Sequence, residues 1–203
     1  MTKAYLLALP LIAAAPLLAQ GGAPQTPGQV DPARVAAGTY TVDNHHAQIL
    51  WTVNHFGFND YFGIFGQPTG SLTIDPAKPN DAKVSVTIPI AEVATSRADL
   101  TKHLMTPDFF DAAKFPTASF QSTKVEASGT KAKITGNLTL LGVTKPVVLD
   151  AAFTGAGKNP MMGKDTIGFH ATTSLKRSDW GMTKFVPFVG DDVKIDISVA
   201  FEK

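Results

Sequence analysis

The stretch Val193-Lys194-Ile195-Asp196-Ile197-Ser198-Val199-Ala200-Phe201 carries an apolar side chain at every second position. Successive side chains of a β-strand point to opposite faces, so one face of this segment is apolar. An earlier segment repeats the pattern with Val84, Val86, Ile88 and Ile90. The same alternation occurs at 118–120, 134–140, 147–153 and 167–175. The chain is therefore predicted to consist largely of half-buried strands.

Turn signals separate these apolar runs. Residues 142–146, which read Gly-Val-Thr-Lys-Pro, predict a tight connection, and the glycine-rich residues 155–160 predict a longer loop. With turns every ten to fifteen residues, about eight strands are expected. The fold class is therefore all-β, an antiparallel barrel or sandwich.

One region interrupts the alternation and predicts two short helices between strands. Ser96 is suited to cap a helix in which Leu100 and Leu104, four residues apart, share a buried face. Thr106-Pro107-Asp108 then has the residue order of a second helix start, with Thr as N-cap and Pro at the first helical position. We expect both helices to plug one end of the barrel.

Residues 1–19 have the character of a secretory signal peptide, because Lys3 precedes an apolar run too short to span a membrane. Residues 20–37 are rich in Gly, Pro, Gln and Ala and predict a flexible leader. The remaining residues, 38–203, suit a single domain located in the periplasm. The chain has no Cys, which excludes disulfides, and its net charge of +1 disfavours nucleic acid as a partner.

Aromatic residues are concentrated in His55-Phe56-Gly57-Phe58-Asn59-Asp60-Tyr61-Phe62-Gly63-Ile64-Phe65-Gly66, which holds four of the 13 Phe. So many Gly disfavour a helix, and so many rings disfavour water. We expect a bent strand-and-turn segment whose rings line an apolar interior. An eight-stranded barrel either fills with side chains or holds one small ligand, so a solid core and a ligand cavity both remain open.

Polar motifs give weaker signals. The five His residues have no ligand spacing typical of a metal site, so no metal is predicted. Arg177 and Asp179 precede Trp180 in sequence and are suited either to a structural ion pair or to holding a polar ligand head.

Four ordered blocks of the sequence resemble the YceI-like polyisoprenoid-binding family. They are Asp43 with His46-Ala47-x-Ile49-x-Trp51-x-Val53-x-His55 and Gly63-x-Phe65; Lys102-His103-Leu104 with Asp108-Phe109-Phe110-Asp111; Lys114-Phe115-Pro116-Thr117-Ala118-Ser119-Phe120; and Gly136-Asn137-Leu138-Thr139-Leu140-Leu141-Gly142-Val143-Thr144-Lys145-Pro146-Val147. The resemblance runs from about Gly38 to the C-terminus. It implies an exported, lipocalin-like antiparallel barrel whose tunnel holds an isoprenoid lipid, such as a ubiquinone or polyprenyl phosphate, without catalysis and without a required cofactor.

The expected ligand-binding residues are rings and aliphatic side chains of the tunnel wall, together with polar groups at its mouth. They are Trp51, Phe56, Phe58, Phe62, Phe65, Phe120, Leu138, Leu140, Phe153, Phe169, Trp180, Phe185, His103, Arg177 and Asp179. Expected partners are the isoprenoid lipid, a membrane in transient contact, and a second copy of the chain in a homodimer. Two alternatives stay open: an enzyme acting on a lipid or small molecule with His103 as general acid or base, and a stress-related interaction module with a filled core.

Overall fold

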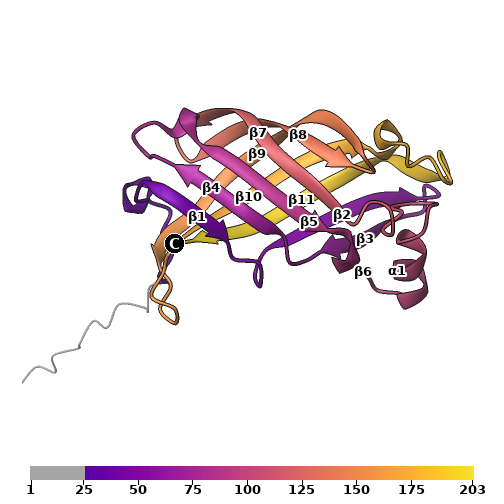
Figure 1. Ribbon diagram of the computed structural model, residues 1–203, viewed down its shortest axis with the longest axis horizontal. Coiled ribbons are helices and arrows are strands. Elements are labelled where there is room, and N and C mark those ends of the chain that lie inside the picture. The colour runs from indigo at the N-terminus through magenta and orange to yellow at the C-terminus, as the bar shows by residue number, and fades with distance from the viewer. Residues whose placement is uncertain (1–25) are drawn as a thin grey trace, which may run out of the picture.

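Side chains alternate between the inside and the outside along almost every strand, and the strands close into an antiparallel barrel (Figure 1). The computed structural model describes residues 26–203. On the last strand, Val193, Ile195, Ile197 and Val199 are half-buried, whereas the side chains between them are exposed or partly exposed. This is the face that the alternation predicts to be apolar and inward.

The barrel wall is built from eleven strand segments, joined by short helices and turns. The segments are β1 (Gly38–Val42), β2 (Gln48–His55), β3 (Asn59–Phe65), β4 (Thr69–Ile74), β5 (Lys83–Pro89), β6 (Val93–Thr95), β7 (Thr117–Ser128), β8 (Lys131–Leu140), β9 (Val143–Lys158), β10 (Asp165–Lys176) and β11 (Val189–Glu202). The helices of the described residues are α1 (Ala98–Leu104) and the 3-10 helices η1 (Pro32–Arg34), η2 (Pro79–Asp81), η3 (Ile90–Glu92) and η4 (Arg177–Trp180).

These segments make eight strands, because three strands are each broken once. β1 and β2 form the first strand, and both pair with β11. β3 and β4 form the second strand, in which β3 pairs with β2 and β4 pairs with β1. β5 and β6 form the third strand, in which β5 pairs with β4 and β6 pairs with β3. The breaks fall at residues 43–47, at 66–68 and at η3. Each strand pairs with its neighbours in sequence, and β11 closes the ring against β1 and β2. The prediction of an antiparallel barrel of about eight strands is confirmed.

The packing of Trp51 explains why position 63 of the aromatic stretch is a glycine. Gly63 pairs with Trp51 across β2 and β3, and a Cβ on Gly63 would overlap the Trp51 indole. Gly136 serves the same purpose beneath the ring of Phe120. An aromatic ring laid over a strand glycine covers backbone that the missing side chain would leave bare. These two glycines therefore let large rings lie flat on the inner wall.

The region between β6 and β7 contains one of the two predicted helices. α1 begins after Arg97, which takes the N-cap position expected for Ser96, while Ser96 Oγ lies 3.1 Å from the hydroxyl of Tyr61. The prediction of a second helix starting at Thr106 is wrong. The hydroxyl of Thr106 donates a hydrogen bond back to the carbonyl of His103 (2.8 Å), and the chain continues in turns.

The predicted turns are partly confirmed. Leu141 and Gly142, both with positive φ, form the two-residue connection between β8 and β9, as is usual in tight hairpins. The longer loop begins only at Asn159, because β9 continues to Lys158. Gly155 and Gly157 are therefore strand residues, contrary to the prediction.

The reason for these strand glycines is the segment 26–37, the described part of the expected flexible leader. Gln29 pairs with Ala156 of β9 through two backbone hydrogen bonds (3.0 and 2.8 Å). A Cβ on Gly157 would overlap the carbonyl oxygen of Pro27. Val35, which follows η1, is buried in the core. This segment is packed against the barrel, whereas the predicted signal peptide lies outside the described residues.

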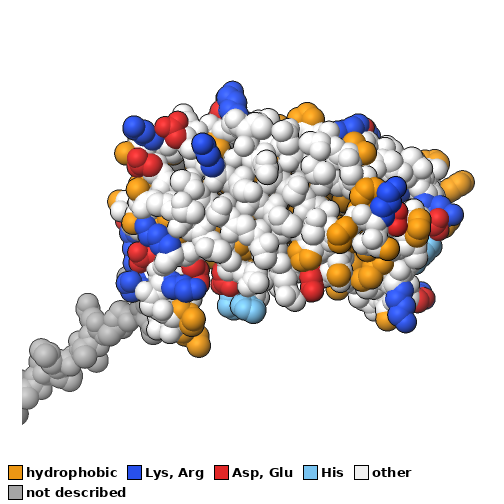
Figure 2. All heavy atoms as spheres, in the orientation of Figure 1, with side chains coloured by type: hydrophobic (Ala, Val, Ile, Leu, Met, Phe, Trp, Pro, Cys, Tyr) orange, Lys and Arg blue, Asp and Glu red, His pale blue; other side chains and the backbone are white. Residues whose placement is uncertain are grey.

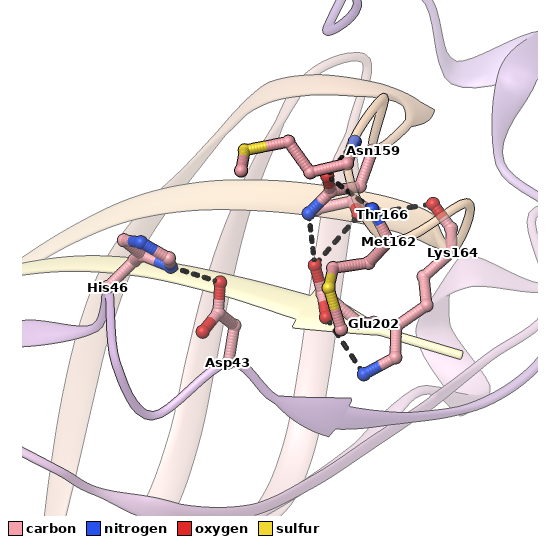
Figure 3. A network of polar contacts seen from close by, with 8 residues as sticks. Asp43, His46, Asn159, Met162, Lys164, Thr166 and Glu202 are labelled. Atoms are coloured by element: carbon pink, nitrogen blue, oxygen red, sulfur yellow. Dashed lines mark hydrogen bonds and ion pairs between the residues drawn. The ribbon is translucent and has the colours of Figure 1, made fainter.

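A polar network fixes the end of β11 (Figure 3). The buried carboxylate of Glu202 accepts hydrogen bonds from Asn159 Nδ2 (2.9 Å), Lys164 Nζ (3.2 Å) and Thr166 Oγ1 (3.3 Å). Burial alone would raise the pKa of Glu202, but the hydrogen bonds from Asn159 and Lys164 outweigh it and hold the pKa below its ordinary value. The C-terminal strand is thus tied to the β9–β10 loop by a charged group.

We expect Glu202→Gln to lower the free energy of unfolding by about 1 kcal/mol at pH 7, because charge-assisted hydrogen bonds are lost. A carboxyl group with a depressed folded pKa stabilises the protein above its ordinary pKa and loses that effect as the pH falls through the folded value. The difference between wild type and variant should therefore shrink below about pH 4. Urea denaturation at pH 7 and pH 3.5 measures it. An equal difference at both pH values would contradict this role.

Candidate ligand-binding cavity

The barrel encloses a cavity of about 390 Å³. This volume lies in the range of roughly 300–1,000 Å³ that is usual for small-molecule sites. Its wall is almost entirely apolar, and every one of the eight strands contributes to it. The rings in the wall are those of Trp51, Phe65, Phe110, Phe120, Phe153, Phe169, Trp180 and Phe201.

Inward side chains stay half-buried although the barrel surrounds them. Ile134, Leu138, Leu149 and Ile195 line the cavity and retain accessible surface. In a solid core such residues would be fully buried, since protein interiors pack as densely as organic crystals. Small residues at inward positions, such as Ala171, account for the unfilled space. Of the two possibilities left open by the sequence, a solid core and a cavity, this interior fits the cavity.

The two ends of the cavity differ. At one end its lining includes exposed residues of the η1, β4–β5 and β7–β8 connections, among them Pro32, Pro76 and Thr130. At the other end, near α1 (Figure 1), the lining residues Arg177 and Trp180 are buried. The cavity thus has a mouth at the end away from α1 and a closed end beside η4.

Nine of the predicted ligand-binding residues lie in the cavity wall. They are Trp51, Phe65, Phe120, Leu138, Leu140, Phe153, Phe169, Arg177 and Trp180. Strands β2, β3, β7, β8, β9 and β10 and helix η4 bring these residues together from distant parts of the chain. Their contact with a ligand stays a prediction.

Six predicted residues lie outside the cavity wall, so the expected inward placement of four rings and the expected place of two polar groups at the mouth are wrong. They are Phe56, Phe58, Phe62, His103, Asp179 and Phe185. Strand parity explains Phe62, because its neighbour Gly63 faces inward against Trp51. Phe58 is 89% exposed because it lies in the turn between β2 and β3, beyond the paired strands.

Three of these four rings, those of Phe56, Phe58 and Phe185, lie outside the closed end. The rings of Phe56 and Phe188 are stacked with centroids 5.9 Å apart, and Phe185 lies 6.3 Å from Phe109. Figure 2 shows hydrophobic side chains concentrated at this end of the molecule, around α1. We call Phe56, Phe58, Phe185 and Phe188 the ring cluster. The chain thus has two apolar surfaces, one inside the barrel and one outside.

His103 lies on the outer side of α1. Its Nε2 is 3.0 Å from Oδ2 of Asp108, and its ring packs edge-on against Phe109. The hydrogen bond from His103 holds the pKa of Asp108 below its ordinary value. Within residues 26–203, no three His, Asp, Glu or Cys side chains converge on a position suited to a metal ion. The expectation of His103 at the mouth of the cavity is wrong.

Arg177 is the charged residue held in the closed end, with only 6% of its surface exposed. Its Nε, Nη1 and Nη2 donate hydrogen bonds to the carbonyls of Gly190 (2.8 Å), Met182 (3.1 Å) and Val189 (2.9 Å). Desolvation lowers the pKa of its guanidinium group, though Asp191 opposes the shift. No carboxylate of the described residues lies within ion-pair distance of the Arg177 guanidinium group. Asp179, expected beside it, instead pairs with Lys145 at 3.2 Å.

Several wall residues are not among the predicted ligand-binding residues. Phe201 and Ile195 were on the apolar face of the last strand, so strand parity alone would have found them. Phe110 and Met182 come from irregular segments that carry no periodic signal. Val35 belongs to the segment expected to be a flexible leader.

None of the helices between residues 26 and 203 has the length and apolar character needed to cross a membrane.

The chain is similar to a family model, to sequence relatives and to solved structures. Residues 40–201 match the family model described as YceI-like domain. A UPF0312 protein of Pseudomonas putida (strain W619) is 40% identical over 166 residues, covering 80% of this chain and 85% of that protein. The crystal structure of a Campylobacter jejuni YCEI protein is 34% identical, with a TM-score of 0.63 over 74% of this chain and 89% of that one.

A further solved structure shares the fold at low identity. It is a polyisoprenoid binding domain from Saccharophagus degradans implicated in plant cell wall breakdown, with 11% identity and a TM-score of 0.64. The match covers 82% of this chain and 99% of that domain.

Arg177→Met should lower the free energy of unfolding by about 3 kcal/mol, because three carbonyls lose their donor together. Arg177→Lys should restore only part of that loss, since an ammonium group cannot match the planar fork of a guanidinium. Asp179→Ala is the control and should change stability by less than about 1 kcal/mol, because its ion pair is exposed. Urea denaturation measures all three. An Arg177→Met variant as stable as Asp179→Ala would contradict the structural role.

Proposed function

The chain belongs to the YceI-like family, as its sequence motifs predicted, and we propose that it holds an isoprenoid lipid of the ubiquinone or polyprenyl phosphate type inside its barrel. The single observation that carries this proposal is a ring-lined apolar cavity of about 390 Å³ with a mouth at one end. The family supports a lipid-binding barrel, and the name of the S. degradans domain points to isoprenoid chains as the ligand class.

The physical basis is the burial of hydrocarbon. Each CH₂ group removed from water contributes about 0.8 kcal/mol, so a chain of several isoprene units gains affinity without any chemical step. The wall offers aromatic and aliphatic surface and few polar groups, which suits a hydrocarbon chain. A bound lipid would be the ligand, and we propose no cofactor besides it.

A binding role without catalysis fits this site better than an enzymatic one. The enzyme alternative depended on a histidine inside the cavity, but His103 is held outside by Asp108. The single guanidinium group of the closed end, Arg177, is engaged by three backbone carbonyls and is a poor proton-transfer group. We therefore propose carriage, storage or scavenging of the lipid.

We propose that residues 1–19 direct export to the periplasm, where such a carrier would meet a membrane. The ring cluster supports membrane contact, because aromatic side chains are favoured at the boundary between lipid and water. Lys184 lies over the ring of Phe185 at 5.3 Å and adds a cation of the kind found near lipid headgroups. A homodimer through the same surface is the competing outcome.

Ala171→Phe tests the cavity directly, since Ala171 is an inward wall residue. The added ring should occupy ligand space and weaken binding of a short-chain ubiquinone at least tenfold, with the barrel still folded. Thr172→Phe, on the outer face of the same strand, is the matched control and should bind as wild type does. Fluorescence titration and circular dichroism provide the readouts. Equal binding by both variants, or failure of the wild type to bind, would contradict the proposal.

Phe58→Asp combined with Phe188→Asp should abolish most sedimentation of the protein with phospholipid vesicles and leave ubiquinone binding intact. Met161→Asp, an exposed apolar residue in the β9–β10 loop, is the control and should sediment as wild type does. A double variant that sediments normally would contradict membrane contact. If the double variant instead converts a dimer to a monomer in light scattering, the ring cluster is a self-association surface.

A further inference from the structure

Residues 26–34, which we call the strap, lie at the mouth of the cavity as a small unit of their own. All but one of these residues are exposed. The side-chain hydrogen bonds of the strap are internal to it. Arg34 Nη1 donates to the carbonyl of Pro27 (3.1 Å), and Asp31 Oδ1 accepts from the backbone N–H of Ala33 (3.0 Å). The strap therefore keeps its shape without help from the barrel.

The attachment of the strap to the barrel is slight. β9 extends past β8, whose pairing ends at Ala152, and Gln29 pairs with Ala156 on the edge beyond. Among the described residues, the two backbone hydrogen bonds of this pair (3.0 and 2.8 Å) are the only ones between the strap and the barrel. Exposed segments with so few hydrogen bonds are the first parts of a protein to open locally.

The residues that follow the strap are, by contrast, firmly held. Val35 is buried in the core. The carbonyl of Ala36 accepts a hydrogen bond from the hydroxyl of Tyr40 (2.7 Å), and Lys203 Nζ donates to the carbonyl of Ala37 (2.8 Å). The strap thus has a fixed pivot at one end and can lift from β9 as a unit.

We propose that the strap controls the passage of the lipid through the mouth by lifting from β9 and closing again. Pro32 of the strap is part of the cavity wall at the mouth, so lifting the strap removes one side of the rim. The inference rests on the proposed function and adds to it a moving part that governs the rates of loading and release. A closing segment of this kind changes entry and exit together, because both need the open form.

Two substitutions loosen the strap from opposite sides. A Cβ on Gly157 of β9 would overlap the carbonyl oxygen of Pro27, and alanine suits a strand interior at least as well as glycine, so Gly157→Ala should displace the strap and leave β9 intact. Gln29→Pro lacks the N–H group that donates to Ala156. Gly66→Ala is the matched control, because it adds the same methyl group outside the strap, where no atom lies within 4 Å.

Hydrogen exchange at the Ala156 amide reports attachment of the strap, since this group donates to Gln29. It should be about fivefold faster in Gly157→Ala and Gln29→Pro, as expected for the loss of one hydrogen bond. Release of a short-chain ubiquinone into phosphatidylcholine vesicles, followed by tryptophan fluorescence in a stopped-flow instrument, should accelerate by a similar factor. Entry should accelerate equally, so that Kd changes less than about twofold. Gly66→Ala should match the wild type in every measurement.

A reversible lock tests the opposite direction. Gln29 and Ala156 exchange both backbone hydrogen bonds, an arrangement that places Cα atoms about 5.5 Å apart and within disulfide range. The chain has no Cys, so Gln29→Cys combined with Ala156→Cys can form one disulfide only. In the oxidised double variant, release of ubiquinone should be at least about fivefold slower than in the wild type. Reduction should restore the wild-type rate.

The outcomes separate this inference from the proposed function. Wild-type release rates in the loosened variants and in the oxidised lock would overturn the inference and leave lipid binding intact. Self-association of Gly157→Ala at an unchanged release rate would overturn it too, and would identify the strap as a cover for the edge of β9. Faster release with unchanged entry would make the strap a fixed part of the binding wall, again contrary to the inference. A wild-type protein that binds no ubiquinone would overturn the proposed function itself.

Discussion

The closure of eight strands into one ring is the constraint on which the rest of the structure depends. An eight-stranded barrel has an interior that side chains can just fill, so the sizes of the inward residues decide whether it is solid. Here large rings alternate with small residues, including Ala118, Ala151 and Ala171. Gly63 and Gly136 let two of the rings lie flat on the wall. The result is a hollow interior with an apolar surface.

Closure depends on pairing along the whole length of β11, in a chain without disulfides. Three strands are broken, yet each pair of segments stays aligned with the same neighbour, so no edge of the ring is left open. Closed barrels have no free edges for further pairing. Segment 26–37 and α1 then cover opposite ends, and the exposed connections that line the cavity lie at the end near segment 26–37.

Strand parity made much of this architecture predictable. The alternation from Val193 to Phe201 correctly assigned the inward face, and the family blocks correctly indicated the barrel. The prediction that the rings of the aromatic stretch point inward is wrong at Phe58 and Phe62, because a hairpin turn and an inward Gly63 place those rings outside. Periodicity cannot identify contacts made between distant segments. For this reason the sequence does not predict the packing of residues 26–37 on β9 or the hydrogen bonds from Arg177 to three backbone carbonyls.

The central claim is that the hollow barrel holds an isoprenoid lipid, and the content of the purified protein tests it most directly. The full-length gene should be expressed with its N-terminal region, and the protein purified without detergent and extracted with organic solvent. Mass spectrometry of the extract should detect a prenyl lipid of the ubiquinone or polyprenyl phosphate type in wild type and much less in Ala171→Phe. An extract without prenyl lipid, from a protein that also fails to take up added ubiquinone, would contradict the account.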